Sequence, residues 1–348
     1  MDRRNFLKTT GAVAVAASAA TAPASAAEEE APDRHLPAPA ILSGTRVLAL
    51  SSQWVQHAGC GPERLARRIE AATGGRYRFA IGHEMGDAEV TYGSAGRHIA
   101  RHPAFAFFAG LPFAQGLGAA DQAAWLSVGG GGMLWDELAA GFAFKPLLAG
   151  QAGSGPGVWA SARLESPDDF ARATLHVDGL AADVVQALGA ASVRLPADEL
   201  GQALAGGRIQ AAEWLGPYPA EGAASPGPLS QRVYEPAFHR GGMALTLDVR
   251  KDVWLTLGDG DRLLFEACAA QEHQLSLAEM RAHAALARQL QAPAKWPVRL
   301  AWSEAVEEAL DEAMADILAR VAATDAAARR IHDSYQAFRH LLGEDLIA

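Results

Sequence analysis

Strand-like and helix-like segments alternate between residues 166 and 215, and this alternation limits the fold more than any other feature of the chain. Ser166 is expected to begin a helix, because it is a capping residue followed by acidic residues in the first turn. Short apolar strands are predicted at 175–177, 193–195 and 209–215, and helices at 181–188 and 197–205. Strands joined through helices lie parallel in one sheet. We therefore expect an α/β fold.

The rest of the chain continues this mixed pattern. A helix is predicted from Pro62 to the glycine pair at 74–75, followed by a half-buried strand at 77–81. The end of the chain is mostly helical: one long helix is expected at 259–290 and another over 303–342, with a short strand at 298–302 between them. The chain thus has an α/β body and long helices near its end.

The N-terminus has the three parts of an export signal. Arg3 and Arg4 precede a run of small apolar residues, and Ala24-Ser25-Ala26 has the form of a cleavage site. The paired arginines followed by Phe-Leu-Lys resemble a twin-arginine (Tat) signal. We expect cleavage after Ala26, an exported protein in a periplasm, and a disordered lead-in at 27–44. An uncleaved membrane anchor is the alternative.

The charge and the cysteine count exclude several classes of protein. The chain has 40 acidic and 30 basic residues, a net charge of −10, which argues against a nucleic-acid partner. Its two cysteines, Cys60 and Cys268, build neither a disulfide framework nor a zinc site. Whether they pair is left open by the sequence.

Two glycine-rich segments have structural interpretations. Residues 150–157 hold four glycines, but a strand-like Val-Trp-Ala follows them instead of the helix that a phosphate-binding loop requires. A crossing between two lobes fits this segment better. The four glycines at 129–132 lie between two helical patterns and predict a helix–helix connection, although bare backbone could also approach a ligand.

Motifs for catalysis and metal binding are weak. His98 and His102 have the spacing of two zinc ligands on one helix, but Pro103 stops that helix and no adjacent glutamate accompanies them, so we expect surface histidines. The sequence contains no Gly-x-Ser-x-Gly elbow. We therefore predict no catalytic residue and no enzyme activity.

One segment carries a specific resemblance. Residues 194–218 end in Glu213-Trp214-Leu215-Gly216-Pro217-Tyr218, and supporting motifs occur at 102–113 and at 238–242. These motifs resemble the substrate-binding proteins of TRAP transporters, the DctP-like family, and in particular its 2-oxo acid/mannitol/chloroaromatic-type branch. The resemblance covers roughly residues 45–300.

The resemblance implies a two-lobed, periplasmic binding protein-like α/β fold with a cleft between the lobes. Lobe I would comprise 45–158 and 243–302, including a long connecting helix, and lobe II would comprise 159–242. Residues 303–348 would form a C-terminal helical segment. Such a protein captures a small organic acid, for example a 2-oxo acid or an aromatic or hydrophobic carboxylate, and delivers it to the TRAP permease membrane subunits.

The chain departs from the family pattern at the residues that bind the ligand carboxylate. The family arginine that grips the ligand carboxylate corresponds to His176 here, and the glutamate of the Trp-His-Glu motif corresponds to Arg240. We expect Arg240 to restore the positive charge from another wall of the site.

Four further residues are predicted ligand contacts. Glu213 and Trp214 match the family and are candidate ligands of a sodium or calcium ion, Gly155 replaces a glutamine and opens volume, and Phe238 lies in the Trp-His-Glu segment. No other cofactor is expected.

Other functions stay open at this stage. A Tat-exported enzyme and a binding protein that acts as a ligand sensor are the alternatives to transport. The late helical segment could also mediate a homodimer.

Overall fold

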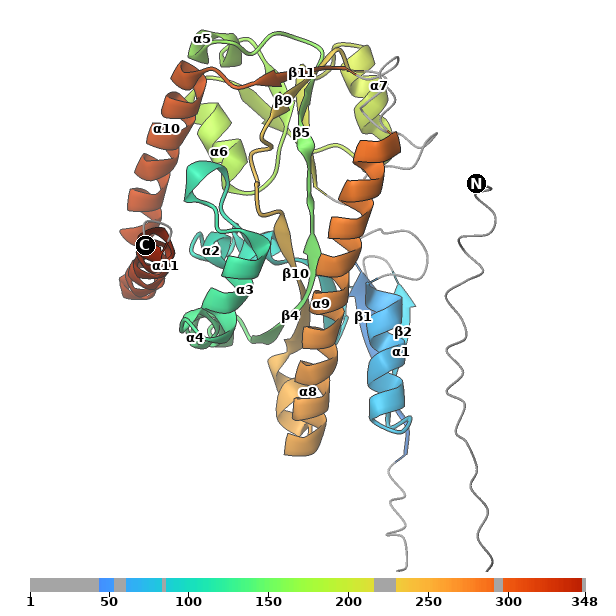
Figure 1. The fold of residues 1–348 in the computed structure, drawn as a ribbon. Helices are drawn as coiled ribbons and strands as arrows, with labels where there is room; N and C mark the ends of the chain where they lie inside the picture. The colour runs from blue at the N-terminus through green and yellow to red at the C-terminus, as the bar shows by residue number, and fades with distance from the viewer. Residues whose placement is uncertain (1–43, 53–60, 83–85, 216–229, 291–296, 346–348) are drawn as a thin grey trace, which may run out of the picture. The chain divides into compact units, whose positions relative to one another are not determined.

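The computed structural model describes residues 44–52, 61–82, 86–215, 230–290 and 297–345 (Figure 1). These residues form two β-sheets with helices packed around them, so the predicted α/β class is confirmed. The sheets have five and six strands, and each belongs to a largely separate layer of the fold.

The five-stranded sheet has the order β2-β1-β3-β10-β4. Strand β1 runs parallel to both of its neighbours, β2 and β3. Strand β10 runs antiparallel to both of its neighbours, β3 and β4. The strands are β1 (Arg46–Ser52), β2 (Tyr77–Gly82), β3 (Val90–Ser94), β4 (Phe144–Ala152) and β10 (Met243–Arg250). Leu48, Leu50 and Leu247 pack in the core of this layer, together with the helices α1 (Pro62–Ala72), α8 (Lys251–Thr256) and α9 (Asp259–Leu290).

The six-stranded sheet has the order β11-β9-β5-β8-β6-β7. Strands β8, β6 and β7 run parallel, as the alternating sequence predicts. The strands are β5 (Ser154–Ala160), β6 (Thr174–His176), β7 (Ala191–Val193), β8 (Ala211–Leu215), β9 (Arg232–Glu235) and β11 (Val298–Ala301). The helices of this layer are α5 (Pro167–Phe170), α6 (Leu180–Ala187), η4 (Ala197–Glu199) and α7 (Leu200–Ala205).

Two chain segments connect the sheets. Strand β4 of the first sheet continues into β5 of the second with Gly153 between them, and residues 236–242 lead from β9 back to β10. Helix α9 lies along β4 and extends beyond it toward the six-stranded sheet (Figure 1). The segment 150–157 therefore lies in a strand crossing and not in a phosphate-binding loop, as predicted.

An aromatic core holds the remaining helices. The Phe108 ring stacks between Trp125 and Trp135, with centroids 5.4 and 5.1 Å away. A side chain at Gly131 would meet the Trp125 ring at 2.6 Å, which explains a glycine at the start of α4. The predicted helix–helix connection at 129–132 is thus confirmed. The helices are η2 (Ala95–His98), α2 (Phe105–Ala109), η3 (Phe113–Gln115), α3 (Ala119–Ser127), α4 (Gly131–Ala140), α10 (Glu304–Ala322) and α11 (Ala326–Asp345).

The structure differs from the sequence prediction at the end of the chain. We predicted one helix over 303–342, but α10 and α11 are separate, and they pack against each other. The Asp325 side chain accepts a hydrogen bond from the Ala328 N–H at 2.7 Å and so caps the first turn of α11. The local cap overrides the continuous apolar spacing on which the prediction rests.

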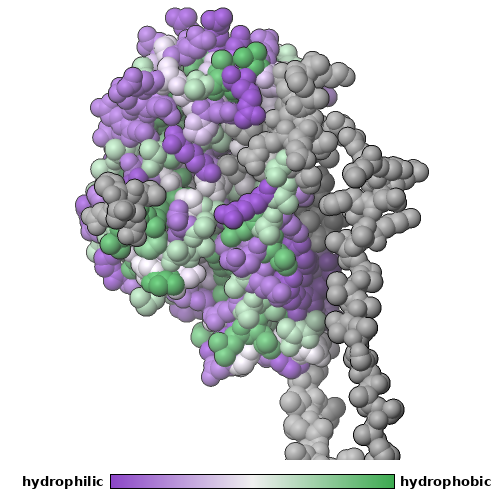
Figure 2. All heavy atoms as spheres, in the orientation of Figure 1, coloured by the Kyte–Doolittle hydropathy of each residue, from purple (hydrophilic) through white to green (hydrophobic). Residues whose placement is uncertain are grey.

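The surface shown in Figure 2 mixes hydrophilic and hydrophobic residues. Hydrophobic atoms gather over the lower end, where α8 and the beginning of α9 lie, and Leu255 and Leu263 are exposed there. None of the described helices is both long and apolar enough to span a bilayer.

Candidate ligand-binding site

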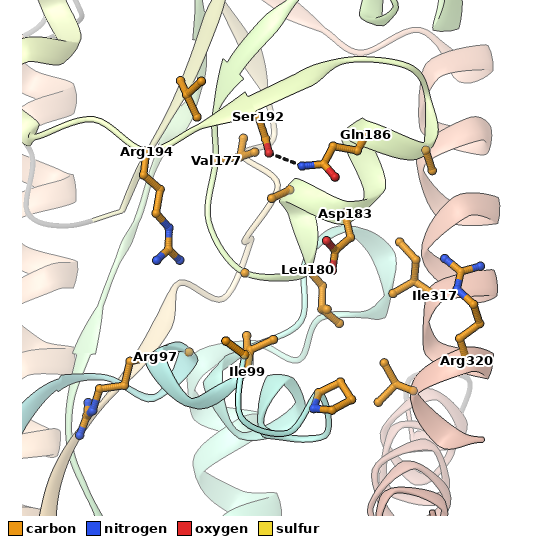
Figure 3. A pocket seen from close by; sticks show the side chains of 18 of the residues that line it. Arg97, Ile99, Val177, Leu180, Asp183, Gln186, Ser192, Arg194, Ile317 and Arg320 are labelled. Atoms are coloured by element: carbon orange, nitrogen blue, oxygen red, sulfur yellow. Dashed lines mark hydrogen bonds between the residues drawn. The ribbon is translucent and has the colours of Figure 1, made fainter. Parts of the chain in front are cut away.

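A cavity of about 990 Å³ lies between η2 with the residues that follow it, the helices α6 and α10, and the end of β7 in the six-stranded sheet (Figure 3). Its upper wall follows the carboxyl ends of the parallel strands β6 and β7, and η2 and residues after it form the facing wall. In α/β sheets, ligands bind outside the carboxyl ends of the parallel strands. The side chains that line the cavity include Ile99, Val177, Leu180, Val193, Ile317 and Val321.

Arg194 is the cationic residue that follows β7 at this cavity. Its Nε pairs with Asp178 Oδ1 at 2.5 Å, while 70 % of the side chain stays exposed. Figure 3 shows it pointing from the β7 end into the space between the walls. Arg97, on the facing wall, turns its guanidinium away from Arg194 and pairs with Asp248. Arg194 is therefore the more accessible of these two guanidinium groups.

His176 lies at the end of β6, next to β8. Its Nδ1 accepts a hydrogen bond from the Leu195 N–H at 3.1 Å, so the ring proton is on Nε2. Burial lowers the pKa of His176, and Arg194 lowers it further against the opposing effect of Asp178 and Glu213. The position of the family arginine thus carries a neutral hydrogen-bond donor.

Glu213, on β8, forms a buried pair with His239. The side chains of Glu213 and His239 are each 1 % exposed. One carboxylate oxygen accepts the His239 backbone N–H at 2.7 Å, and the other accepts from His239 Nδ1 at 2.7 Å. Burial alone would lower the pKa of His239, but Glu213 and Asp178 outweigh it, and the pKa stands above its ordinary value.

The opposite edge of the His239 ring turns toward the cavity wall. Its Nε2 is buried and has no hydrogen-bond partner among the described residues. A methyl group built on Gly179, which lines the cavity, would lie 3.7 Å from this nitrogen. Gly179 has φ +59°, a conformation that favours glycine, so the backbone there leaves the Nε2 edge uncovered by a side chain.

The other predicted site residues lie apart from this pair. Phe238 is buried in the core, with its ring stacked on Trp302 at 5.4 Å. Arg240 is exposed and pairs with Glu307 of α10 at 3.2 Å. Gly155 lies in β5, and Trp214 lies in β8 with a side chain outside the described part of the structure. Ligand contacts by these four residues stay predictions.

The two spaced histidines are not surface residues, contrary to our expectation. The side chains of His98 and His102 are each 12 % exposed. His98 Nε2 contacts Asp248 at 2.6 Å, whereas His102 Nε2 contacts Asp325 at 2.9 Å. Each ring thus has its own carboxylate partner. Among the described residues, no three metal-binding side chains come together.

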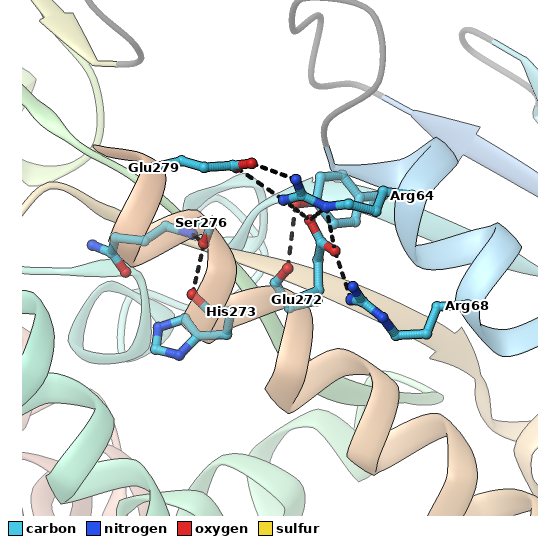
Figure 4. Close-up of polar contacts among 9 residues, drawn as sticks. Arg64, Arg68, Glu272, His273, Ser276 and Glu279 are labelled. Carbon is cyan, nitrogen blue, oxygen red and sulfur yellow. Dashed lines mark hydrogen bonds and ion pairs between the residues drawn. The ribbon is translucent and has the colours of Figure 1, made fainter. Parts of the chain in front are cut away.

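A second polar cluster lies between α1 and α9 (Figure 4). Glu272, which is 1 % exposed, binds Arg64 at 2.6 Å and Arg68 at 2.9 Å. Glu279, about two turns further along α9, also pairs with Arg64. The cluster fastens the long helix to α1 of the five-stranded sheet. Cys268 lies buried on the same helix, while Cys60 is outside the described residues.

Comparisons with known proteins show which proteins the chain is similar to. No family model matches the chain. A monocarboxylate 2-oxoacid-binding periplasmic protein from Nostoc sp. is 28% identical over 308 residues, 83% of each chain. A TRAP transporter solute-binding protein from Bordetella bronchiseptica, solved with copurified calcium and picolinate, has a TM-score of 0.78 at 23% identity, over 87% of this chain and 95% of that one. The chain has the fold of a TRAP solute-binding protein. The resemblance predicted from the sequence is thus confirmed.

Two further TRAP periplasmic solute-binding proteins share the fold. The one from Colwellia psychrerythraea, with bound calcium and pyruvate, has a TM-score of 0.74 at 19% identity, over 86% of this chain and 96% of that one. The one from Pseudoalteromonas atlantica, with bound sodium and pyruvate, has a TM-score of 0.75 at 19% identity, over 86% and 95%. In both of these relatives a cation accompanies a small carboxylate.

Two residues of the site were missed by sequence reasoning. Arg194 opens the segment that carries the family resemblance, and its position after a predicted strand was the available signal. His239 lies between Phe238 and Arg240, but its partner Glu213 is 26 residues away. Only the folded arrangement of β8 and the 236–242 connection brings the two side chains together.

Proposed function

We propose that this protein is an exported solute-binding protein that captures a small monocarboxylate, of the 2-oxo acid class, in the cavity lined by η2, α6, α10 and the end of β7. The observation that carries the proposal is the cavity at the carboxyl ends of β6 and β7, in a chain similar over 83% of its length to a 2-oxoacid-binding protein. The protein resides in a periplasm and delivers its ligand to TRAP permease membrane subunits. It performs no chemistry on the ligand.

The ligand carboxylate binds to Arg194 in this proposal. The guanidinium group offers a planar fork of N–H donors that matches the two oxygens of a carboxylate. Its Nε is already engaged with Asp178, which orients the group, and the rest of the side chain is exposed to the cavity. A second, neutral donor in this proposal is the Nε2–H of His176, which lies at the end of β6 next to the cavity-lining Val177 and is not itself among the lining residues.

The remainder of the ligand is apolar. Side chains of Ile99, Val177 and Leu180 line the cavity, and its volume of about 990 Å³ is at the upper end for small-molecule sites. Gly155, where the family has glutamine, adds no side chain to the crossing strands. The body of an aliphatic or aromatic 2-oxo acid would pack against these side chains, while Asp183, Gln186 and Arg320 give other parts of the wall polar groups.

A thermal-shift screen of the purified protein tests this function. The panel contains 2-oxo acids, aromatic carboxylates, sugar acids and polyols of matched size. A ligand at 100 times its dissociation constant stabilises the folded state by about 2.7 kcal/mol, which gives a measurable rise in Tm. We expect the largest shifts from monocarboxylates with apolar bodies. Shifts by polyols alone would contradict the proposal.

The same ligands distinguish transport from the alternatives. Incubation of each stabilising compound with the protein, followed by NMR of the solution, should show the compound unchanged; turnover would favour an exported enzyme. Loss of ligand uptake on deletion of the permease genes would support delivery to a transporter. Unchanged uptake would instead favour a sensor.

A further inference from the structure

The cation seen in related proteins does not fit the residues of this site. The family resemblance makes Glu213 and Trp214 candidate cation ligands, and it places a glutamine at position 155 and a glutamate at position 240. Position 155 is glycine and offers no side-chain oxygen, and Arg240 is a cation paired with Glu307. Only Glu213 contributes a carboxylate at these positions.

Both oxygens of that carboxylate are already engaged. Oε1 accepts the His239 backbone N–H and Oε2 accepts from His239 Nδ1, each at 2.7 Å. A sodium or calcium ion prefers several oxygen ligands, often including carboxylates. An ion here would compete with the buried imidazole and with a buried backbone N–H for the same two oxygens, and the loss of either hydrogen bond is unfavourable.

One nitrogen of the His239 ring has no hydrogen-bond partner among the described residues. Its Nε2 is buried, has no hydrogen-bond partner in the described part of the chain, and faces Gly179 at the cavity wall. Buried polar atoms are nearly always satisfied in folded proteins, and a ligand is one way to satisfy them. A polar group of the bound carboxylate compound would form the missing hydrogen bond with His239 Nε2.

We infer that the Glu213–His239 pair takes the place of the cation, so that this protein binds its carboxylate ligand without a metal ion and with His239 as a specificity-determining contact. This inference rests on the proposed function. It predicts that this site binds the same class of ligand without the calcium or sodium ion that accompanies the carboxylate in the related structures.

Calorimetric titration tests the inference with pyruvate, picolinate and phenylpyruvate as probes. Each is titrated into EDTA-treated, desalted protein, and then in the presence of calcium chloride or sodium chloride, with choline chloride as the ionic-strength control. We expect affinities that agree within about twofold across these conditions. A tenfold or greater gain with calcium or sodium would overturn the inference.

Two variants of His239 separate the roles of its two ring nitrogens. In His239→Asn the side-chain amide can still donate to Glu213 in place of Nδ1, but Nε2 is lost. We expect weaker ligand binding, by about tenfold, that stays insensitive to calcium. In His239→Ala the Glu213 side chain loses its Nδ1 partner, and calcium chloride alone should now raise the Tm. Unchanged ligand affinity in His239→Asn would contradict the contact through Nε2.

Calcium chloride added alone to the wild-type protein keeps the two proposals distinguishable. If no carboxylate binds under any condition, the proposed function fails. The experiment with calcium chloride alone still tests whether the Glu213–His239 pair excludes a cation, because the inference predicts no shift in Tm for the wild type. A calcium-induced shift in the wild type would overturn the inference whatever the ligand.

Discussion

At the scale of single residues, the site combines groups with different degrees of burial. Arg194 is mostly exposed at the cavity, whereas the Glu213 and His239 side chains are almost completely enclosed. An exposed guanidinium contributes little to folding but can form charge-assisted hydrogen bonds with a ligand. The buried pair joins β8 to the 236–242 connection. Substitutions at these residues should therefore separate binding from stability.

Arg194→Ala should weaken carboxylate binding with little change in Tm. A hydrogen bond to a charged group contributes about 1.5–3 kcal/mol, which corresponds to a loss of roughly 10- to 150-fold in affinity. Calorimetric titration of the best ligand from the screen measures it. Arg240→Ala is the matched control, because Arg240 is exposed and paired with Glu307 outside the cavity lining. Loss of affinity in the control and not in Arg194→Ala would instead support our sequence-based prediction for Arg240.

His273 should make the protein sensitive to acid. Burial lowers the pKa of this α9 histidine to about 4, from an ordinary value of 6.5. The unfolded chain therefore takes up the proton first, so stability is intact above about pH 6.5 and falls as the pH drops toward 4, by about 3 kcal/mol in total. Urea unfolding at pH 7 and pH 4.5 measures the difference.

The matched variant His273→Met isolates this effect from other titrating groups. Methionine fills a similar volume without a titratable group, so the loss of stability between the two pH values should be smaller than in the wild type. An equal loss in both proteins would show that His273 is not protonated on unfolding in this range.

At the scale of elements, α9 is fixed to the five-stranded sheet by charge as well as by apolar packing. Phe265 and Ala269 pack in the core of that layer, and Glu272 binds Arg64 and Arg68 of α1. The two arginines keep about a fifth of their side chains exposed, whereas Glu272 is buried. The ion pairs of Glu272 therefore hold α1 and α9 together.

Glu272→Ala should destabilise the protein by about 3 kcal/mol, because it breaks buried ion pairs with Arg64 and Arg68 and leaves Arg64 with Glu279 alone of these two carboxylates. Urea unfolding at pH 7 measures the change. Glu266→Ala on the same helix is the control; that side chain is 44 % exposed and lies 4.0 Å from Lys145, so its removal should change stability little. Equal effects of the two substitutions would contradict the role assigned to the cluster.

The elements also show where the sequence is informative. The helices α6 and α7 and the parallel strands β6, β7 and β8 were predicted, because clear apolar periodicity is bounded by turn residues. Strands β3, β4 and β9 were not. Strand β4 contains Pro146 and is apolar on both faces, so it lacks the alternation that marks a half-buried strand. Strand β9 has four residues and depends on its neighbours β5 and β11.

The site was less predictable than the fold. Glu213 and His176 were found because the family resemblance points to their positions. The engagement of Glu213 by His239 depends on where the 236–242 connection passes β8, and no local pattern reports that approach. Similarly, the partner of Arg240 is on α10, 67 residues away. Side-chain pairing across distant segments is decided by tertiary packing.

At the scale of the whole molecule, the two sheets are joined by the β4–β5 crossing, the 236–242 connection and the long helix α9. The cavity is lined by η2 and the residues after it, by α6 and the end of β7 in the six-stranded sheet, and by α10. Two sheets that are joined by few segments are typical of proteins that close on a ligand by a hinge motion. This arrangement suits capture and release of a small solute.

Native mass spectrometry of the purified protein tests the central claim most directly. The protein is incubated with an equimolar pool of 2-oxo acids, aromatic carboxylates and polyols, with and without calcium chloride. We predict a complex of one chain with one monocarboxylate, formed equally well without calcium. A complex with a polyol, or a carboxylate complex that appears only with bound calcium, would contradict the account.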